Sequence, residues 1–215
     1  MTKRWLRDHK RDPYYRRAKA QGYRSRASYK LMQISLRFEI IKPGNSIVDL
    51  GCAPGGWLQV ALELSLPGGT VIGVDLDRVK PLTGAIIFQG DMREPEVARK
   101  VSEALPRGRA DIVLSDMSPN ISGNYNIDHA KSIELSELAL DFACKVLRPG
   151  GKFVAKVFVG DMYRDYLREV SRYFQSCRAH HPKASRSTSS ETYVIGKGFR
   201  PAKAGSYQKD TMDEE

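Results

Sequence analysis

The chain has 215 residues, a length typical of one domain with a substantial core. No apolar run approaches the roughly 20 residues of a membrane span, and the basic N-terminus lacks the apolar segment of a secretory signal. Three cysteines and four histidines are scattered without metal-ligand or disulfide spacing. We therefore expect a reduced, cytoplasmic protein with no metal site and no membrane partner.

The net charge of +10 is concentrated at the N-terminus. The first 30 residues contain 11 Lys or Arg against two Asp, and they also contain five aromatic residues. Basic side chains interleaved with aromatic rings suit a polyanion whose bases can stack, which favours RNA over a membrane. The alternative is a basic tail that only improves solubility.

Apolar spacing predicts the elements in chain order. Ala27, Leu31, Ile34, Phe38 and Ile41 recur at helical spacing, and "KPGN" at 42–45 ends that helix. A second amphipathic helix covers 135–146, "RPGG" at 148–151 stops it, and a third helix follows at 162–174. Strands are expected at 46–51, 70–75, 85–91, 110–118 and 151–158, with a final antiparallel pair formed by 178–185 and 191–199.

Strands that alternate with helices predict an open α/β sheet wound on both sides. We expect three regions: a basic RNA-binding arm over 1–24, the folded domain over 25–200, and a polar, disordered tail over 201–215.

A glycine-rich loop, "VDLGCAPGGW" at 48–57, follows the first predicted strand. Its glycines allow a tight turn and a close approach to a ligand, although the spacing is not the GxGxxG of dinucleotide folds. Asp49 just before the loop disfavours a phosphate and suits a cationic ligand. The expected contacts from this segment are Asp49, Gly51, Ala53, Pro54, Gly55, Gly56 and Trp57.

Two further acids end the next two strands, Asp75 and Asp91. A carboxylate at the end of the second strand commonly holds a ribose diol. Three acids at three neighbouring strand ends suit an adenosine that carries an amino acid and a sulfonium, which is S-adenosylmethionine. Leu76 and Met92 beside these acids are expected to contact it too; helix capping by each acid is the alternative.

The segment after the fourth strand, "SDMSPN" at 115–120, narrows the choice of the group that accepts the methyl. It is not the Asp/Asn-Pro-Pro-aromatic turn of base amino-group methylases, and no cysteine is well placed as a nucleophile for pyrimidine carbon. A hydroxyl acceptor remains, and it needs alignment and help in losing its proton.

Lys156 lies in the middle of the fifth predicted strand, between "FVA" and "VFV". A buried ammonium is costly, and burial together with a second cation favours the neutral amine that can act as a base. Asp116 at the neighbouring strand end could orient it, Lys30 is a candidate second cation, and Glu191 could pin one of the lysines. A lysine that reaches solvent from a frayed strand end is the alternative.

These segments together resemble the FtsJ/RrmJ-like ribose 2′-O-methyltransferases, specifically the large-subunit ribosomal RNA methyltransferase E group. The resemblance runs from about Tyr23 to Phe199, and its carriers are "YRSRASYKL", "DLGCAPGGW", "GVDLD", "QGDMRE", "LSDMSPNISG", "GGKFVAKVF" and "SRSTSSETYVIG". It implies a Rossmann-like class I S-adenosylmethionine-dependent methyltransferase: a mostly parallel seven-stranded sheet with helices on both faces and an antiparallel last strand.

The family's catalytic tetrad falls on Lys30, Asp116, Lys156 and Glu191. The resemblance implies that Lys156 acts in deprotonating the ribose hydroxyl while the others orient and tune it. It also implies cofactor contacts from Gly55, Trp57, Asp75, Asp91 and Asp116, with S-adenosylhomocysteine as the product.

The resemblance further implies methylation of a uridine ribose in large-subunit ribosomal RNA, free or in the assembled subunit, by a monomer. RNA docking is then expected mainly on the N-terminal arm, through Arg4, Arg7, Arg11, Arg16, Arg17, Arg24 and Arg26. Alternatives are methylation of a tRNA anticodon-loop ribose, a non-catalytic RNA-binding or ribosome-assembly protein of the same fold, and an NAD-linked enzyme.

Overall fold

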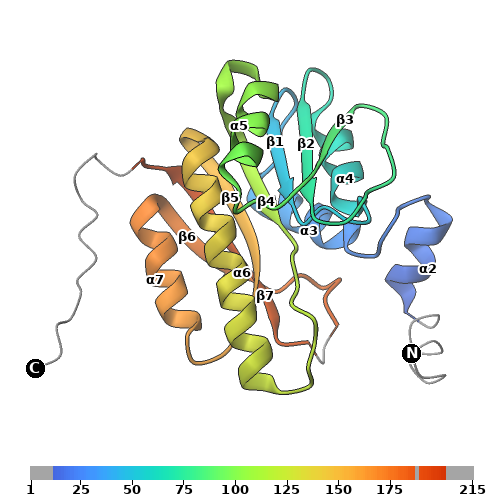
Figure 1. Cartoon of the computed structure of the whole chain (residues 1–215). Coiled ribbons are helices and arrows are strands. Elements are labelled where there is room, and N and C mark those ends of the chain that lie inside the picture. The colour runs from blue at the N-terminus through green and yellow to red at the C-terminus, as the bar shows by residue number, and fades with distance from the viewer. Residues whose placement is uncertain (1–11, 187–188, 202–215) are drawn as a thin grey trace, which may run out of the picture.

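A computed structural model describes residues 12–186 and 189–201 of the chain (Figure 1). Its centre is a seven-stranded sheet in the order β3-β2-β1-β4-β5-β7-β6. Only β7 runs opposite to the other strands, since it pairs antiparallel with both β5 and β6. The predicted fold class is therefore confirmed. The strands are β1 (Ser46–Leu50), β2 (Thr70–Asp75), β3 (Ala85–Gln89), β4 (Ala110–Ser115), β5 (Leu147–Phe158), β6 (Phe174–His180) and β7 (Glu191–Phe199).

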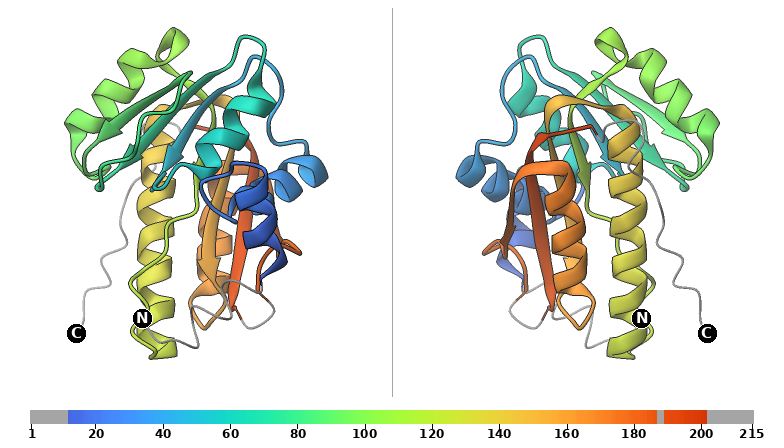
Figure 2. Two further views of the ribbon diagram at one scale, coloured as in Figure 1. Left: turned by 90° about the vertical axis from the view of Figure 1, so that its right-hand side faces the viewer. Right: turned by 90° about the vertical axis from the view of Figure 1, so that its left-hand side faces the viewer.

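Helices cover both faces of this sheet (Figures 1 and 2). Helices α3 (Ser28–Phe38) and α4 (Gly56–Ser65) bury one hydrophobic cluster against it, which includes Leu31 and Leu58. Helices α5 (Pro95–Ala104), α6 (Tyr125–Val146) and α7 (Tyr163–Tyr173) bury a second cluster on the opposite face. A short 3-10 turn, η1 (Pro106–Gly108), precedes β4. Within the described ranges, no helix is long and apolar enough to cross a membrane.

The last part of the predicted arm packs on the domain as helix α2 (Pro13–Ala20). Asp12 begins this helix, because its carboxylate accepts hydrogen bonds from the main-chain N–H groups of Tyr14 and Tyr15. Ala18 is buried beside Tyr29 and Ala184. Arg4, Arg7 and Arg11, like the predicted tail from 202 onward, lie outside the described residues.

The strands predicted at 85–91 and 110–118 end earlier, at Gln89 and Ser115, and three predicted boundaries were wrong by four residues or more. Helix α6 begins ten residues before 135, because Asn124 caps it and its first turns bury polar residues that apolar spacing does not detect. "RPGG" is not a break between elements, since β5 begins at Leu147, which pairs with Ala110 of β4. The partner of β7 is 174–180 rather than 178–185, because β6 follows α7 directly.

Candidate active site

The two-residue alternation of the strands places the polar side chains of the site on one face of the sheet. Val154 of β5 and Leu114 of β4 pack with the α3 and α4 cluster. Lys156, two residues after Val154, and Asp116, two residues after Leu114, therefore follow on the same side. Tyr193 stands directly opposite Lys156 in the antiparallel pair of β5 and β7, and it belongs to the same cluster.

Two ion pairs assemble the four predicted catalytic residues. The Lys156 ammonium donates to the main-chain oxygen of Asp116 at 2.7 Å and lies 3.3 Å from its carboxylate. The Lys30 ammonium lies 2.5 Å from the carboxylate of Glu191. Lys30 belongs to α3, which packs on the sheet, and Glu191 is the first residue of β7. Both lysines are buried. The structure thus brings Lys156 beside Asp116 and pairs Lys30 with Glu191.

Glu191 responds to burial differently from an isolated carboxylate. Burial raises the pKa of Glu191, but the charge and hydrogen bond of Lys30 outweigh it, so that the pKa lies below its ordinary value. Glu191 therefore remains a carboxylate and stays paired with Lys30. The charge of Lys156 also lowers the pKa of Glu191, which links the two ion pairs electrostatically.

Tyr193 joins the two pairs, and the sequence reasoning missed it. Its phenol donates a 2.6 Å hydrogen bond to the Asp116 carboxylate, and the Lys30 ammonium lies 5.7 Å from its ring centroid. Burial raises the pKa of Tyr193 well above its ordinary value, and the charges of Asp116 and Glu191 add to the shift. The phenol therefore stays protonated and serves as a donor.

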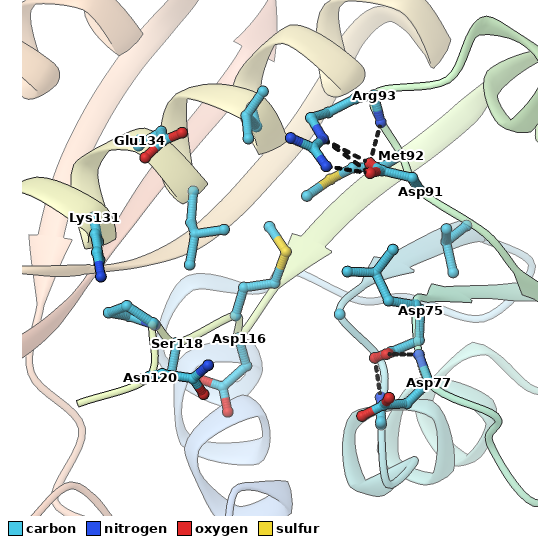
Figure 3. Close-up of a pocket in the computed structure, with 18 of the residues that line it drawn as sticks. Asp75, Asp77, Asp91, Met92, Arg93, Asp116, Ser118, Asn120, Lys131 and Glu134 are labelled. Carbon is cyan, nitrogen blue, oxygen red and sulfur yellow. Dashed lines mark hydrogen bonds and ion pairs between the residues drawn. The ribbon is translucent and has the colours of Figure 1, made fainter. Parts of the chain in front are cut away.

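A cavity of about 640 Å³ opens at the carboxyl ends of β1, β2, β3 and β4 (Figure 3). Gly51 must be glycine there: its φ is 68°, and a Cβ would lie 2.2 Å from the Cγ of Met117. The loop from 117 to 120 and one side of α6 close the opposite wall. Of the predicted cofactor contacts, this cavity is lined by Gly51, Ala53, Asp75, Leu76, Asp91, Met92 and Asp116.

The acids in the cavity are organised by neighbouring main-chain groups. Asp75 accepts from the N–H groups of Ala53 and Asp77 at 2.7 and 2.8 Å, which holds the glycine loop against β2. Asp91 accepts from the side chain and main chain of Arg93, and these hydrogen bonds lower its pKa (Figure 3). Asp91 is thereby held as a carboxylate, and both side chains are fixed at the cavity edge.

Asp49 of β1 does not line the cavity, although it lies two residues before the cavity-lining Gly51, and its environment is exceptional. It is 1% exposed, and neither carboxylate oxygen has a hydrogen-bond partner among the described residues. Burial raises its pKa well above the ordinary value, with the charges of Asp116 and Asp75 adding to the shift. A buried carboxyl without partners needs a compensating group, and a cationic ligand would supply one.

The other predicted cofactor residues do not line this cavity. Trp57 is buried, donates its indole N–H to the Ala27 carbonyl and lies 5.8 Å from the Tyr193 ring. Pro54, Gly55 and Gly56 form the turn on which the N-terminal segment packs: the Arg24 guanidinium donates to the carbonyls of Pro54, Lys80 and Pro81. Arg24 therefore fastens the glycine-rich loop to the segment that contains Lys80 and Pro81.

The other predicted RNA contacts within the described residues differ in exposure. Arg16 and Arg17 are exposed on α2. Arg26 is largely buried, pairs with Asp12 and donates to the Ala184 carbonyl. Helix α2 therefore presents two exposed cations, whereas Arg26 holds α2 against the body of the protein.

This arrangement allows Lys156 to accept a proton from a ligand group bound between the lysine and the cavity described above. Asp116 is the connecting residue, because it lines the cavity and also contacts both Lys156 and Tyr193. No cluster of three or more His, Cys, Asp or Glu side chains that could hold a metal ion occurs in residues 12–186 and 189–201.

Comparison with known proteins places the chain in one family. The model of the family described as FtsJ-like methyltransferase matches residues 23–199. A protein of Methanothrix thermoacetophila named ribosomal RNA large subunit methyltransferase E is 53% identical over 94% of this chain and 79% of its own length. A protein of Methanosarcina acetivorans with the same name is 52% identical over 96% of this chain and 75% of its own length.

Solved structures give the same fold. A Plasmodium falciparum protein assigned as a ribosomal RNA methyltransferase superposes with a TM-score of 0.75 at 30% identity, over 82% of this chain and 98% of its own. A structure from Clostridium thermocellum at 15% identity and a TM-score of 0.52 covers 80% of this chain and 97% of its own, and supports the fold alone.

Proposed function

The chain belongs to the FtsJ-like methyltransferase family, and we propose that it methylates the 2′-hydroxyl of a uridine ribose in large-subunit ribosomal RNA. The names of the relatives supply the class of RNA. One observation carries the choice of a hydroxyl acceptor: the buried Lys156 amine lies against Asp116, which lines the cavity. Methylation of a hydroxyl requires a proton acceptor at that position. Methylation of a nucleobase amino group instead requires a turn that holds the planar NH₂ group.

The cavity residues fit S-adenosylmethionine as the methyl donor. Asp49 is a buried carboxyl without a hydrogen-bond partner among the described residues, and the bound ligand's positive charge would compensate it. Asp75 would hold the ribose hydroxyls and Asp91 the edge of the adenine, while Leu76 and Met92 would pack on the ring system. When bound, the ligand supplies a methyl group on a sulfonium, which is already activated for transfer.

The protein's own contribution is alignment and removal of a proton. We assign Lys156 as the group that accepts the 2′-hydroxyl proton, since its nitrogen is fixed by two contacts to Asp116. Tyr193 positions Asp116 from the other side. The Lys30–Glu191 pair adjoins Tyr193, whose ring centroid lies 5.7 Å from the Lys30 ammonium, and it helps to orient the site from the α3 side.

The RNA would enter over the face that bears α2. Arg16 and Arg17 are exposed there, and phosphate contacts of this kind make affinity fall with salt. Changing both to Gln is expected to reduce the slope of log affinity against log salt by about 1.4, or roughly 0.7 per lost contact with a single strand. An unchanged slope would remove these two residues from the interface; Arg99→Gln on α5, whose side chain pairs with Glu96 and Glu103, is the matched control.

The decisive experiment is transfer of a labelled methyl group from S-adenosylmethionine to unmodified large-subunit rRNA, assembled subunits and tRNA in parallel. Digestion of the labelled RNA should yield 2′-O-methyluridine from rRNA or subunits. Label on a base would contradict the hydroxyl assignment. Label in tRNA alone would instead identify an anticodon-loop ribose of tRNA as the substrate.

A further inference from the structure

Exposed apolar side chains gather beside the tetrad, at the start of α6 and the end of β5. Tyr125 is 55% exposed, and Val159 and Met162 are also exposed. The phenol of Tyr125 donates to the Val159 carbonyl, and His129, which stacks on Tyr125, accepts from the N–H of Met162. These contacts make Tyr125, Val159 and Met162 one patch, which we call the apolar ledge.

The tyrosine ring at the centre of the ledge is held in one orientation. Its centroid lies 6.3 Å from that of the His129 imidazole, with only 14° between the planes. His129 is 4% exposed and is bonded at both nitrogens, to the Phe158 carbonyl and to the Met162 N–H. A ring fixed at its hydroxyl and against a buried imidazole loses little conformational entropy when a second ring stacks on it.

The segment that delivers Tyr125 is equally well fixed. The Asp128 carboxylate accepts from the N–H and hydroxyl of Ser122 and from the N–H of Gly123. Asn124 then caps α6 by accepting from two main-chain N–H groups. The turn between the cavity wall and Tyr125 is therefore preorganised.

The ledge is continuous with the proposed reaction centre. Val159 lies three residues after Lys156, and its N–H donates to the carbonyl of Ser190, next to Glu191. On the other side, residues 118–120 line the cavity and Tyr125 follows five residues later. A nucleotide whose ribose lies at Lys156 therefore has neighbours within reach of the ledge.

We propose that Tyr125 is a stacking platform for an unpaired nucleobase adjacent to the methylated nucleotide. The proposal rests on the proposed function, because it takes single-stranded RNA as the ligand. Sequence-tolerant binding of single strands commonly combines exposed aromatic rings with cationic side chains, and this protein also carries exposed arginines on α2. The ledge centres on one planar ring flanked by Val159 and Met162, which suits a base better than the extended face of a protein partner.

Three variants of the full-length protein test the platform. Tyr125→Leu keeps apolar bulk and removes the ring, Tyr125→Phe keeps the ring and removes the phenol, and Leu36→Ala changes an exposed apolar residue on α3. Loss of a stacked base should raise the KM for unmodified large-subunit rRNA about tenfold in Y125L. We expect Y125F and L36A to stay within about twofold of the unchanged protein, with the affinity for S-adenosylhomocysteine unaltered in all three.

A direct readout uses a short single-stranded RNA that carries 2-aminopurine beside a uridine. Stacking on Tyr125 should quench its fluorescence with the unchanged protein and with Y125F, and the quenching should disappear with Y125L. Retained quenching and an unchanged KM in Y125L would overturn the proposal. So would a defect of Y125L confined to assembled subunits, because that would make the ledge a contact for a ribosomal protein.

The unchanged protein separates this proposal from the proposed function. If it methylates no RNA, the proposed function itself has failed and the platform fails with it. If it methylates RNA and Y125L does so equally well, only the platform is overturned.

Discussion

The two halves of the site are built in opposite ways. In the cavity half, Asp91 bonds to Arg93 two residues away, and Asp75 bonds to Asp77 two residues away and to Ala53 across 22 positions, so that these acids are positioned by main-chain groups over short stretches of the chain. In the proton-removing half, Asp116 meets Lys156 and Tyr193 across 40 and 77 positions of the chain. Local construction tolerates change at one residue, whereas the buried, long-range half leaves a charge or donor unpaired whenever one member is lost.

The largest effect is expected at Lys156. Lys156→Met removes the proposed base, and kcat should fall by about a hundred- to ten-thousandfold. Lys156 does not line the cavity, so the affinity for S-adenosylmethionine should stay within about twofold. Single-turnover methyl transfer and calorimetric titration measure the two quantities.

Lys152 offers the matched control on the same strand. Its ammonium donates to the carbonyls of Glu39 and Ile40 at the end of α3, away from the tetrad. Lys152→Met should keep its turnover. Near-normal turnover of Lys156→Met would remove Lys156 from the chemistry.

The next largest effect is expected on stability, after loss of one member of the buried Lys30–Glu191 pair. Glu191→Gln leaves the buried Lys30 ammonium without its carboxylate, and the free energy of unfolding should fall by about 3 kcal/mol at neutral pH. Adding Lys30→Met should restore part of the loss, because no unpaired charge then remains. Urea unfolding of the single and double variants measures this coupling.

The pH dependence of that loss gives its own check. The pKa of Glu191 is lowered in the folded protein, so its stabilising contribution is present above the ordinary range of a glutamate and is lost as pH falls through the folded value. The difference between the unchanged protein and Glu191→Gln should therefore shrink below about pH 4. A difference independent of pH would assign it to packing.

A smaller effect is expected at Tyr193. Tyr193→Phe keeps the packing against Trp57 and removes the hydrogen bond to Asp116. We expect kcat to fall about tenfold with the KM for RNA unchanged, because a bond to a charged group is worth about 1.5 kcal/mol. A raised KM at constant kcat would instead make Tyr193 a substrate contact.

The smallest effect belongs to the cavity half. The pKa of Asp49 is raised by burial, so the stability that its neutral form gives is lost as pH rises through the folded value. Asp49→Asn should therefore gain about 1 kcal/mol of stability at pH 8 and almost nothing at pH 4. Thermal unfolding at the two pH values tests this, and the same variant should bind S-adenosylmethionine more weakly.

The sequence predicted the sheet because its strands are apolar runs bounded by turns. Lys156 stood out for the same reason, as a charge inside such a run. Tyr193 could not be singled out: a tyrosine in "ETYVIG" is typical of a core strand, and only the register opposite Lys156 gives it a role. Helix α2 was missed because only Ala18 of its eight residues is buried, which leaves no apolar periodicity to detect.

The position of β7 in the sheet has a consequence for how the protein folds. It is the last strand in chain order, yet it inserts between β5 and β6 and carries both Glu191 and Tyr193. Long-range pairing forms slowly because loop closure costs entropy, whereas the cavity is built from elements between β1 and α6. A refolding chain should therefore regain binding of S-adenosylhomocysteine before it regains methyl transfer, with docking of β7 as the step that separates the two.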